Sequence, residues 1–449
     1  MENDSENNYR ELIVGINTKV PLSNKKLVAA INFDNAATTP PFVSVIQEIN
    51  NFAPWYSSIH RGTGYKSKIS SDFYDDSRNE VLNFVGADPY YYTAVYLKNT
   101  TEAINKISYR MYTKNKRCVI LSTSMEHHSN DLPWRDKFKV DYIDVDNTGR
   151  LSLKDMEKKL RKYNGEVKLV TISGASNVTG YVNPIYKAAQ IAHKYNAKIL
   201  VDAAQLISHR KISMGNPYSI NHIDFLAFSS HKMYSPFGIG VLIGPKEFFE
   251  NGEPEYKGGG VVKIVTKNTV IYDDPPEKDE AGTPNIMGVV ALIAAIKTLN
   301  SIGMENIEEH EKKLLKYTID NLREIKDIEI YCDTQNISDR IGIIPFNIKD
   351  IPHDTLASIL SCEAGISVRS GCFCAHPYVQ KILKLSEKQI KSYIKYPQSP
   401  RPGMVRISFG LYNTTEEVDV LIEMLKKISQ NKEDYIQRYC PESNFKKIN

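Results

Sequence analysis

The sequence has few cysteines, little net charge and no long hydrophobic run. Six cysteines among 449 residues are too few for a disulfide framework. A formal net charge of +4, from 57 basic and 53 acidic residues, provides no electrostatic basis for binding nucleic acid or a membrane surface. The longest charge-free apolar run, Ile286–Ile296, is too short to cross about 30 Å of hydrocarbon. We therefore expect neither a nucleic-acid nor a membrane partner.

The remaining composition is that of a folded protein, because 41% of the residues are hydrophobic and 24% are charged. A chain of 449 residues exceeds the size of one ordinary domain. The N-terminal segment Met1–Arg10 is polar and acidic, without the apolar stretch of a signal peptide. These features predict a cytoplasmic globular protein with more than one domain.

Nearly continuous apolar runs between residues 118 and 244 predict buried strands. The predicted strands are Cys118–Ser122, Lys168–Ser173, Lys198–Ala203, Phe225–Ser229 and Ile239–Gly244. An amphipathic helix is expected over Asn183–Tyr195, with Pro184 near the favoured first position. Repeated strand–helix–strand units build an α/β structure with a mainly parallel sheet and helices on both faces.

The pattern after residue 298 is more mixed and predicts a smaller α+β domain. A strand is expected over Gly365–Arg369, and the last helix, Thr415–Ser429, begins with a capping box. In this box Thr414 precedes Glu417 by three residues. We expect three parts: an N-terminal segment over residues 1–29 that packs with the small domain, a large domain over residues 30–297, and a small C-terminal domain over residues 298–449.

Polar residues follow several predicted strands, at the edge where open α/β sheets bind ligands. They are His127, Asn177, Asp202, Gln205, Ser229, His231 and Lys232. A lysine directly after a buried strand loses hydration, which lowers its pKa and makes its amine nucleophilic. Pyridoxal 5'-phosphate (PLP) requires such a lysine for a Schiff base and an aspartate for its ring nitrogen. Thr100 and Thr101, at the start of a predicted helix, offer hydroxyls and free N–H groups to a phosphate.

Ten short motifs occur in an order that is typical of one enzyme family. They are Phe33-Asp-Asn-Ala-Ala-Thr-Thr, His60-Arg-Gly-Thr-Gly, Asn99-Thr-Thr-Glu-Ala-Ile-Asn, Met125-Glu-His-His-Ser-Asn, Ser176-Asn-Val-Thr-Gly, Val201-Asp-Ala-Ala-Gln, Phe228-Ser-Ser-His-Lys, Glu280-Ala-Gly-Thr-Pro, Val368-Arg-Ser-Gly-Cys-Phe-Cys-Ala and Val405-Arg-Ile-Ser. From Phe33 to the C-terminus, the chain resembles the class V, fold-type I PLP-dependent aminotransferase superfamily, and most closely its group II, SufS-like cysteine desulfurases. The resemblance implies a fold-type I transferase, in which helices flank the mainly parallel sheet of a large domain and a small α+β C-terminal domain follows.

The resemblance also implies roles for individual residues. Lys232 would carry PLP and move the α-proton of the substrate, Asp202 would pair with the ring nitrogen, and His127 would stack on the ring. The other implied cofactor-binding residues are Thr100, Thr101, Asn177, Gln205, Ser229, His231 and Thr283, and the implied substrate-binding residues are Asn177, Arg369 and Arg406. Because these enzymes are homodimers with shared active sites, Thr283 would reach the phosphate of the partner subunit.

Two of the six cysteines, Cys372 and Cys374, are separated by a single residue. The resemblance places the sulfur-accepting nucleophile at Cys374, which would form a persulfide, with Cys372 as a candidate relay. Nucleophilicity requires a thiolate, and a nearby cation such as Arg369 lowers the pKa of a thiol. Two alternatives are a metal site with His376, which lacks a clear fourth ligand, and a pair of inert buried thiols. We predict no metal site in the chain.

The cysteine loop departs from the SufS-like pattern in two ways. Cys372 occupies a position where that branch usually has a histidine. A similar Gly-Cys-Phe-Cys run occurs in the PLP domain of molybdenum-cofactor sulfurases, which also desulfurate cysteine. In addition, an insertion over Tyr378–Pro402 places Cys374 and Arg406 32 residues apart. This insertion would cover the site or form a docking surface for a sulfur-acceptor protein.

The sequence therefore predicts a PLP-dependent cysteine desulfurase, which removes sulfur from L-cysteine, releases L-alanine and holds the sulfur as a persulfide on Cys374. Three alternatives share the cofactor: a selenocysteine lyase, a cysteine C–S lyase, and a class V enzyme that acts on a different amino acid. A non-enzymatic alternative is a sulfur-carrier scaffold that retains the PLP fold.

Overall fold

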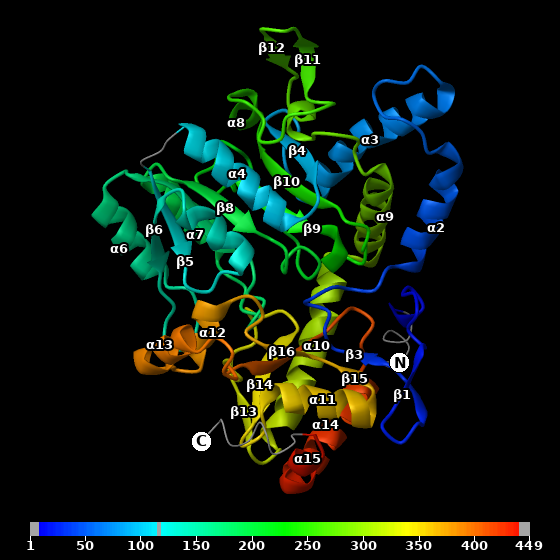
Figure 1. The fold of residues 1–449 in the computed structure, drawn as a ribbon, viewed down its shortest axis with the longest axis vertical. Helices are drawn as coiled ribbons and strands as arrows, with labels where there is room; N and C mark the ends of the chain where they lie inside the picture. Colours follow the sequence, from blue (N-terminus) through cyan, green and yellow to red (C-terminus); the bar gives the residue numbers. More distant parts are fainter. Residues whose placement is uncertain (1–8, 115–117, 440–449) are drawn as a thin grey trace.

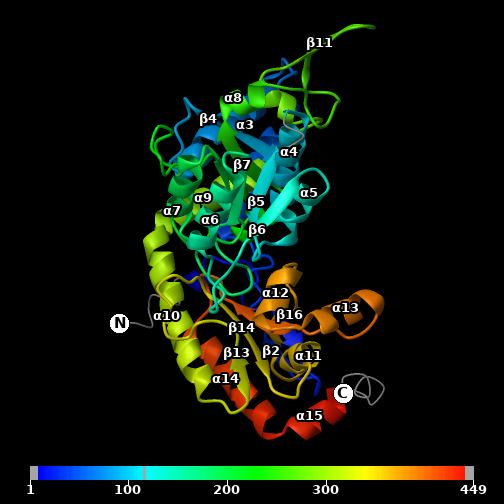
Figure 2. The same ribbon diagram turned by 90° about the vertical axis from the view of Figure 1, so that its left-hand side faces the viewer.

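The computed structural model of the chain describes residues 9–114 and 118–439. Residues 1–8, which belong to the predicted N-terminal segment, and Cys440 lie outside the described residues. Figure 1 shows two lobes, of which the upper contains a seven-stranded sheet and the lower a four-stranded sheet. Helix α10 (Met304–Arg323) runs from the upper lobe along one side of the lower lobe (Figure 2).

The upper lobe is built around a mainly parallel sheet. Its strands, in order across the sheet, are β4 (Tyr92–Leu97), β10 (Gly240–Pro245), β9 (Phe225–Ser229), β8 (Lys198–Asp202), β7 (Val167–Ser173), β5 (Val119–Thr123) and β6 (Lys139–Ile143). The strands from β9 to β6 are parallel, whereas β10 lies antiparallel between β9 and β4. Each of the five predicted strands agrees with an observed strand to within one residue at either end. This sheet confirms the predicted α/β fold.

Both faces of the sheet are buried, as nearly continuous apolar strands require. In β5, Val119 and Leu121 belong to one core cluster and Ile120 belongs to another. The helices of this lobe are α2 (Val43–Phe52), α3 (Tyr65–Phe84), α4 (Thr100–Lys114), α5 (Leu132–Arg135), α6 (Leu153–Tyr163), α7 (Ile185–Lys194), α8 (Lys246–Glu250) and α9 (Ile286–Ile302). A hairpin of β11 (Val262–Val265) and β12 (Val270–Tyr272) projects at the top of Figure 1.

The lower lobe has an antiparallel sheet covered by helices. Its strand order is β13 (Ile328–Ile330), β14 (Ile343–Ile348), β17 (Met404–Ser408) and β16 (Arg369–Gly371). Besides α10, its helices are α11 (His353–Ala364), α12 (His376–Ile382), α13 (Glu387–Lys395), α14 (Thr415–Gln430) and α15 (Lys432–Tyr439). The expected capping box starts α14, where the side chains of Thr414 and Glu417 each accept a hydrogen bond from the other residue's backbone N–H.

The strand predicted over residues 365–369 is divided between two sheets. β15 (Ile366–Ser367) pairs in parallel with β3 (Ile31–Asn32), and after Val368 the chain joins the four-stranded sheet as β16. A single regular strand cannot serve both partners, because β3 and β17 belong to different sheets. As a result, Arg369 lies opposite Arg406 of β17.

The N-terminal segment contains a hairpin, β1 (Lys19–Pro21) and β2 (Leu27–Ala29). The N–H of Ser23, in the turn, donates a hydrogen bond of 2.7 Å to the carbonyl of Cys362 in α11. The side chain of Val28 lies beside Gly365, at the end of the same helix. These contacts join the hairpin to the lower lobe. The division of the chain between residues 29 and 30 and between residues 297 and 298 stays a prediction.

Within residues 9–114 and 118–439, no single helix combines the length and apolar character needed to cross a membrane. Helices α9 and α10 meet that test only as a pair, and they are bent by 75° at the break between them. Most of the apolar residues of α9 are buried, and the helix packs against α2 and α3.

A buried ion pair holds the start of the loop that carries Thr283. The Arg78 guanidinium, on α3, donates two hydrogen bonds of 2.8 and 3.0 Å to the Glu280 carboxylate. The Tyr74 hydroxyl and the Tyr96 N–H each donate a further hydrogen bond of 2.6 Å to this carboxylate. The exposed side-chain fractions are 10% for Arg78 and 6% for Glu280. Loss of the carboxylate charge would therefore leave a buried cation without its partner.

We predict that Glu280→Gln lowers the free energy of unfolding by about 3–5 kcal/mol, because the buried Arg78 loses its counter-charge. Urea denaturation measures the change. The matched control is Asp72→Asn on the same helix, since Asp72 and its partner Lys68 have side chains that are 57% and 71% exposed. This control should change the stability by no more than about 0.5 kcal/mol. An equal decrease in the free energy of unfolding in both variants would contradict the prediction that burial makes the Arg78–Glu280 pair important for stability.

Candidate active site

A cavity of about 480 Å³ lies between the lobes, at the carboxyl ends of β5, β7, β8 and β9. Its lining brings together most of the predicted site residues, namely Thr100, Thr101, His127, Asn177, Asp202, Gln205, Ser229, His231, Lys232, Arg369, Cys374 and Arg406. Thr283 and Cys372, although both are described, are not part of this lining. The roles expected for these residues stay predictions.

Lys232 and Asp202 line the cavity from two neighbouring strands. Asp202 ends β8, and Lys232 follows β9 in the short helix η3 (Ser230–Lys232). Desolvation by the surrounding protein lowers the pKa of the Lys232 amine to about 8, although the charge of Asp202 opposes this shift. Burial raises the pKa of Asp202, whose carboxylate accepts a hydrogen bond of 2.9 Å from the Ala204 N–H. A cation beside Asp202 would favour the charged form of this carboxylate, so Asp202 suits a protonated ring nitrogen.

His127 follows β5, and desolvation lowers its pKa to about 4, so the ring is neutral near pH 7. The Ser129 N–H donates to Nδ1 of His127 at 3.1 Å, which leaves the ring proton on Nε2. The preceding residue, Glu126, accepts hydrogen bonds from Asn130 at 2.6 Å and from the Ser173 hydroxyl at 2.7 Å. Burial raises the pKa of this glutamate to about 7. His127 therefore lines the cavity as a neutral ring on a firmly held turn.

The start of α4 lines another part of the cavity with hydrogen-bond donors. Thr100 and Thr101 begin this 15-residue helix, in whose first turn the Thr100 N–H donates to the Ser229 hydroxyl at 2.8 Å and the Glu102 N–H donates to the Asn99 side chain at 3.0 Å. The Thr100 hydroxyl is 2.7 Å from that of Ser229, and the Thr101 hydroxyl is 2.7 Å from that of Ser129. His231 lines the same cavity, and desolvation lowers its pKa to about 4. Because helix N-termini bind anions, this part of the cavity is a candidate phosphate site.

Two arginines from the lower lobe line the cavity and share one carboxylate. Arg406 is buried, and it donates to Asp34 at 3.1 Å and to the Asn177 carbonyl at 2.8 Å. Arg369 is half-exposed and lies 3.4 Å from the other oxygen of Asp34. Within the described residues, Nε of Arg406 has no hydrogen-bond partner. Two guanidinium groups here share the single carboxylate of Asp34, and their excess positive charge suits the binding of a carboxylate ligand.

Cys374 lies in a tight loop between β16 and α12. Phe373 and Cys374 have left-handed backbone conformations, with φ of 51° and 55°, and Gly371 has a φ of 109°. Residues with side chains rarely adopt this conformation, so the loop requires support from its surroundings. The Asn177 amide donates to the Phe373 carbonyl, and the His128 N–H donates to the Cys374 carbonyl, both at 2.7 Å. These contacts hold Cys374 at the cavity with an exposed side chain.

Cys372 has a different environment from Cys374. Its thiol is 3.5 Å from the Pro402 carbonyl, and desolvation raises its pKa. Because Cys374 is exposed and Cys372 is only partly buried, the alternative of two buried thiols is wrong. The insertion begins with Tyr378 in α12, which is buried and donates to the Gly149 carbonyl at 2.6 Å. The first turn of the insertion thus contacts the upper lobe.

Three residues at the site had no role in the sequence-based predictions. Asp34 connects the two arginines, and Ser129 orients the ring of His127. Phe373 places its ring centre 4.9 Å from the guanidinium carbon of Arg406. Asp34 belongs to the motif that begins at Phe33, and this membership indicates that the residue lies near the site. However, Asp34 and Arg406 are 372 positions apart, and no local pattern indicates such a pair.

The fold and the cavity define a class of protein in which the strand ends of an α/β sheet surround a desolvated lysine, an aspartate and an anion-binding helix start. The sequence profile described as "Aminotransferase class-V" matches residues 31–421. The chain therefore belongs to the class-V aminotransferase family. This membership confirms the predicted superfamily.

Several relatives of the chain are named as cysteine desulfurases. The chain is 34% identical over 409 residues to a "Probable cysteine desulfurase" of Halalkalibacterium halodurans, with 89% of this chain and 93% of the relative covered. It is 35% identical over 405 residues to a "Cysteine desulfurase" of Haloferax volcanii, with 88% of each chain covered. Among solved structures, it is similar to the apo form of a cysteine desulfurase from Thermococcus onnurineus NA1, with a TM-score of 0.80 and 33% identity. That similarity covers 93% of this chain and 98% of the solved one, which confirms the predicted fold type.

We predict that Lys232 reacts with a small aldehyde with a pH midpoint near 8, because the neutral amine is the nucleophile and its fraction rises through the lowered pKa. Exposed lysines reach the same reactivity only at about pH 10.4. Cyanoborohydride trapping and peptide mass spectrometry of the ligand-free protein measure the modified fraction. In Asp202→Asn the midpoint should move to lower pH, since the Asp202 charge raises the pKa of Lys232. An upward shift in this variant would contradict the assignment.

Proposed function

We propose that this protein is a PLP-dependent cysteine desulfurase, which converts L-cysteine to L-alanine and retains the sulfur as a persulfide. The observation that carries the proposal is that one cavity is lined by both the desolvated amine of Lys232 and the exposed thiol of Cys374. Phe373, the residue before Cys374, places its ring centre 4.9 Å from the guanidinium carbon of Arg406, so the Cys374 loop lies beside that arginine. The relatives named as cysteine desulfurases support the same activity.

The donors around the cavity fit PLP. Lys232 would hold the cofactor covalently, Asp202 would pair with its protonated ring nitrogen, and His127 would stack on its ring. The proposed phosphate donors are Thr100 and Thr101 at the start of α4, Ser229 at the end of β9 and His231 in η3. The other proposed contacts are Asn177 and Gln205. When bound, PLP supplies an electron sink for negative charge at the substrate α-carbon.

The two arginines would bind the α-carboxylate of L-cysteine. Both arginines line the cavity, and the half-exposed side chain of Arg369 supplies an accessible guanidinium beside Arg406. The neutral amine of Lys232 would accept the α-proton of the substrate. The thiolate of Cys374 would then attack the substrate sulfur, so that an S–S bond forms and the C–S bond breaks. The electron pair of the C–S bond stays with carbon, and protonation completes alanine.

Three further proposals concern the surroundings of the site. The protein forms a homodimer, in which Thr283, exposed in this chain, reaches the phosphate site of the partner subunit. A sulfur-acceptor protein takes the persulfide from Cys374, whose loop borders the insertion over residues 378–402. The location is cytoplasmic, and the free thiols of the described cysteines are consistent with a reducing compartment.

We predict that Cys374→Ser lowers alanine formation from L-cysteine on the order of 100-fold or more, because the nucleophile is lost. The variant should retain the visible absorbance of the bound cofactor, since Lys232 is unchanged. Cys372→Ser is the matched control: it makes the same substitution two positions away, outside the cavity lining, and should retain alanine formation. Amino-acid analysis of the products, with a reductant present to release the sulfur, measures the effect.

Other products or spectra would assign another function. Full activity of Cys374→Ser would show that this thiol is not the nucleophile. Pyruvate in place of alanine would indicate a C–S lyase. Preferred turnover of selenocysteine that survives Cys374→Ser would indicate a selenocysteine lyase. A purified protein without cofactor absorbance, or with absorbance that L-cysteine does not change, would favour the sulfur-carrier scaffold.

A further inference from the structure

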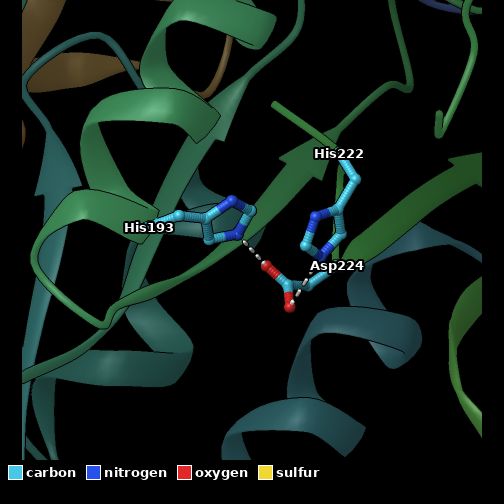
Figure 3. Close-up of side chains that lie close together, drawn as sticks. All are labelled: His193, His222 and Asp224. Atoms are coloured by element: carbon cyan, nitrogen blue, oxygen red, sulfur yellow. Dashed lines mark hydrogen bonds and ion pairs between the residues drawn. The ribbon is translucent and has the colours of Figure 1, made fainter. Parts of the chain in front are cut away.

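Two histidines and an aspartate converge at the amino edge of the seven-stranded sheet, away from the cavity. His193 lies near the end of α7, and His222 and Asp224 precede β9, whose opposite end leads to Lys232. Figure 3 shows both imidazole rings directed toward the Asp224 carboxylate. The side chains of His193, His222 and Asp224 are 14%, 14% and 3% exposed. The cluster is therefore a largely buried set of potential ligands.

Hydrogen bonds determine which nitrogen of each ring carries the proton. Nδ1 of His193 is 2.7 Å from the Ile220 carbonyl, and Nδ1 of His222 is 2.6 Å from the Ser219 carbonyl. A carbonyl oxygen can only accept, so both Nδ1 atoms carry a proton. Both Nε2 atoms therefore face Asp224, at 2.8 Å from Oδ2 for His193 and 3.6 Å from Oδ1 for His222.

This arrangement favours a cation between the rings and the carboxylate. Two neutral rings would direct both Nε2 lone pairs at carboxylate oxygens. If only His193 were protonated, the Nε2 lone pair of His222 would still face Oδ1 of Asp224 at 3.6 Å. Two protonated rings would place like charges in a stack with centroids 4.3 Å apart, beside the Lys198 ammonium 3.0 Å from Asp224. One divalent ion would replace both Nε2 protons and bind all three groups. Metal-binding histidines typically donate their other ring N–H to a carbonyl or carboxylate, as both rings do here.

We propose that His193, His222 and Asp224 bind a divalent first-row transition metal ion of the Zn²⁺ type. Imidazole and carboxylate donors suit such an ion. Zinc–ligand bonds of about 2.0–2.1 Å place the ligand atoms of a tetrahedral site about 3.3 Å apart. The distances of 2.8 and 3.6 Å lie on either side of this value, and all three ligand atoms lie within 4.8 Å of one another. The sequence pattern, in contrast, predicts no metal site.

The surroundings of Asp224 are compatible with a bound ion. The Ile199 N–H donates to Oδ2 at 2.8 Å and orients the carboxylate. Lys198 contacts Oδ1, but its side chain is 49% exposed, so its ammonium can move into solvent when an ion binds. The ion would connect the end of α7 to the start of β9. Because β9 has five residues, about 17 Å of strand separates the ion from Lys232, and the ion would have a structural role.

Zinc binding by the full-length protein with its cofactor tests this proposal. Cys372→Ser and Cys374→Ser are introduced into all samples, so that these thiols do not bind the ion. Equilibrium dialysis against buffered Zn²⁺ should show one ion per chain in this background, and Zn²⁺ should raise its Tm. His193→Ala and His222→Gln should each weaken zinc binding by at least about 100-fold. Substitution of a residue that only hydrogen-bonds to a metal ligand already lowers metal affinity by about 10–100-fold. Each variant should also lose the effect of Zn²⁺ on Tm.

The matched control is His60→Ala, because His60 also pairs with one aspartate, Asp75, at 2.9 Å but does not belong to the cluster. This variant should bind zinc as the background does. Asp224→Asn provides a third ligand change if circular dichroism shows that a histidine variant is unfolded. Absence of a stoichiometric ion in the background would overturn the proposal in favour of a metal-free cluster in which one or both histidines are protonated. Binding that survives His193→Ala and His222→Gln would overturn it in favour of a different site.

Discussion

The buried guanidinium of Arg406 connects the two lobes, and the geometry of the cavity depends on it. Burial of a cation is unfavourable, and desolvation lowers the pKa of Arg406 to about 10. The cost is offset by hydrogen bonds to Asp34, which follows β3, and to the Asn177 carbonyl in the upper lobe. Phe373 adds its ring at 4.9 Å from the guanidinium carbon. Because Phe373 directly precedes Cys374, the residue that joins the lobes also contacts the loop of the proposed sulfur acceptor.

The two groups proposed to react are supported in different ways. Lys232 follows a central strand of the sheet, so its backbone has the position that strand pairing imposes. Cys374 lies on a left-handed loop, whose conformation depends on hydrogen bonds from the Asn177 side chain and the His128 N–H. The Asn177 carbonyl also binds Arg406, so one residue contacts both the cation and the loop. Lys232, the proposed proton-transfer group, benefits from a single fixed position. Cys374, the proposed sulfur carrier, must contact first the substrate and then an acceptor.

The central strands and the residues after them could be predicted from the sequence, because parallel strands buried on both faces are continuous apolar runs. Asp202 and Lys232 were identified in this way. The division of residues 365–369 between β15 and β16 could not be predicted, because an apolar pattern shows that a strand is buried but not which strand it pairs with. The contact of Asp34 with Arg406 could not be predicted either, because the two residues are 372 positions apart and only the fold brings them together.

The proposed metal ligands could not be predicted from the sequence, because they come from separate elements. His193 and Asp224 are 31 positions apart and come from different elements, whereas recognisable metal motifs place ligands within one loop or one helix. Their location follows from the sheet: β8 and β9 bring Asp202 and Lys232 to the carboxyl edge, and the amino ends of these strands are joined by the contact of Lys198 with Asp224. Charged contacts thus occur at both ends of the same two strands. An ion at the amino edge can therefore stabilise the sheet that positions the cavity without taking part in its chemistry.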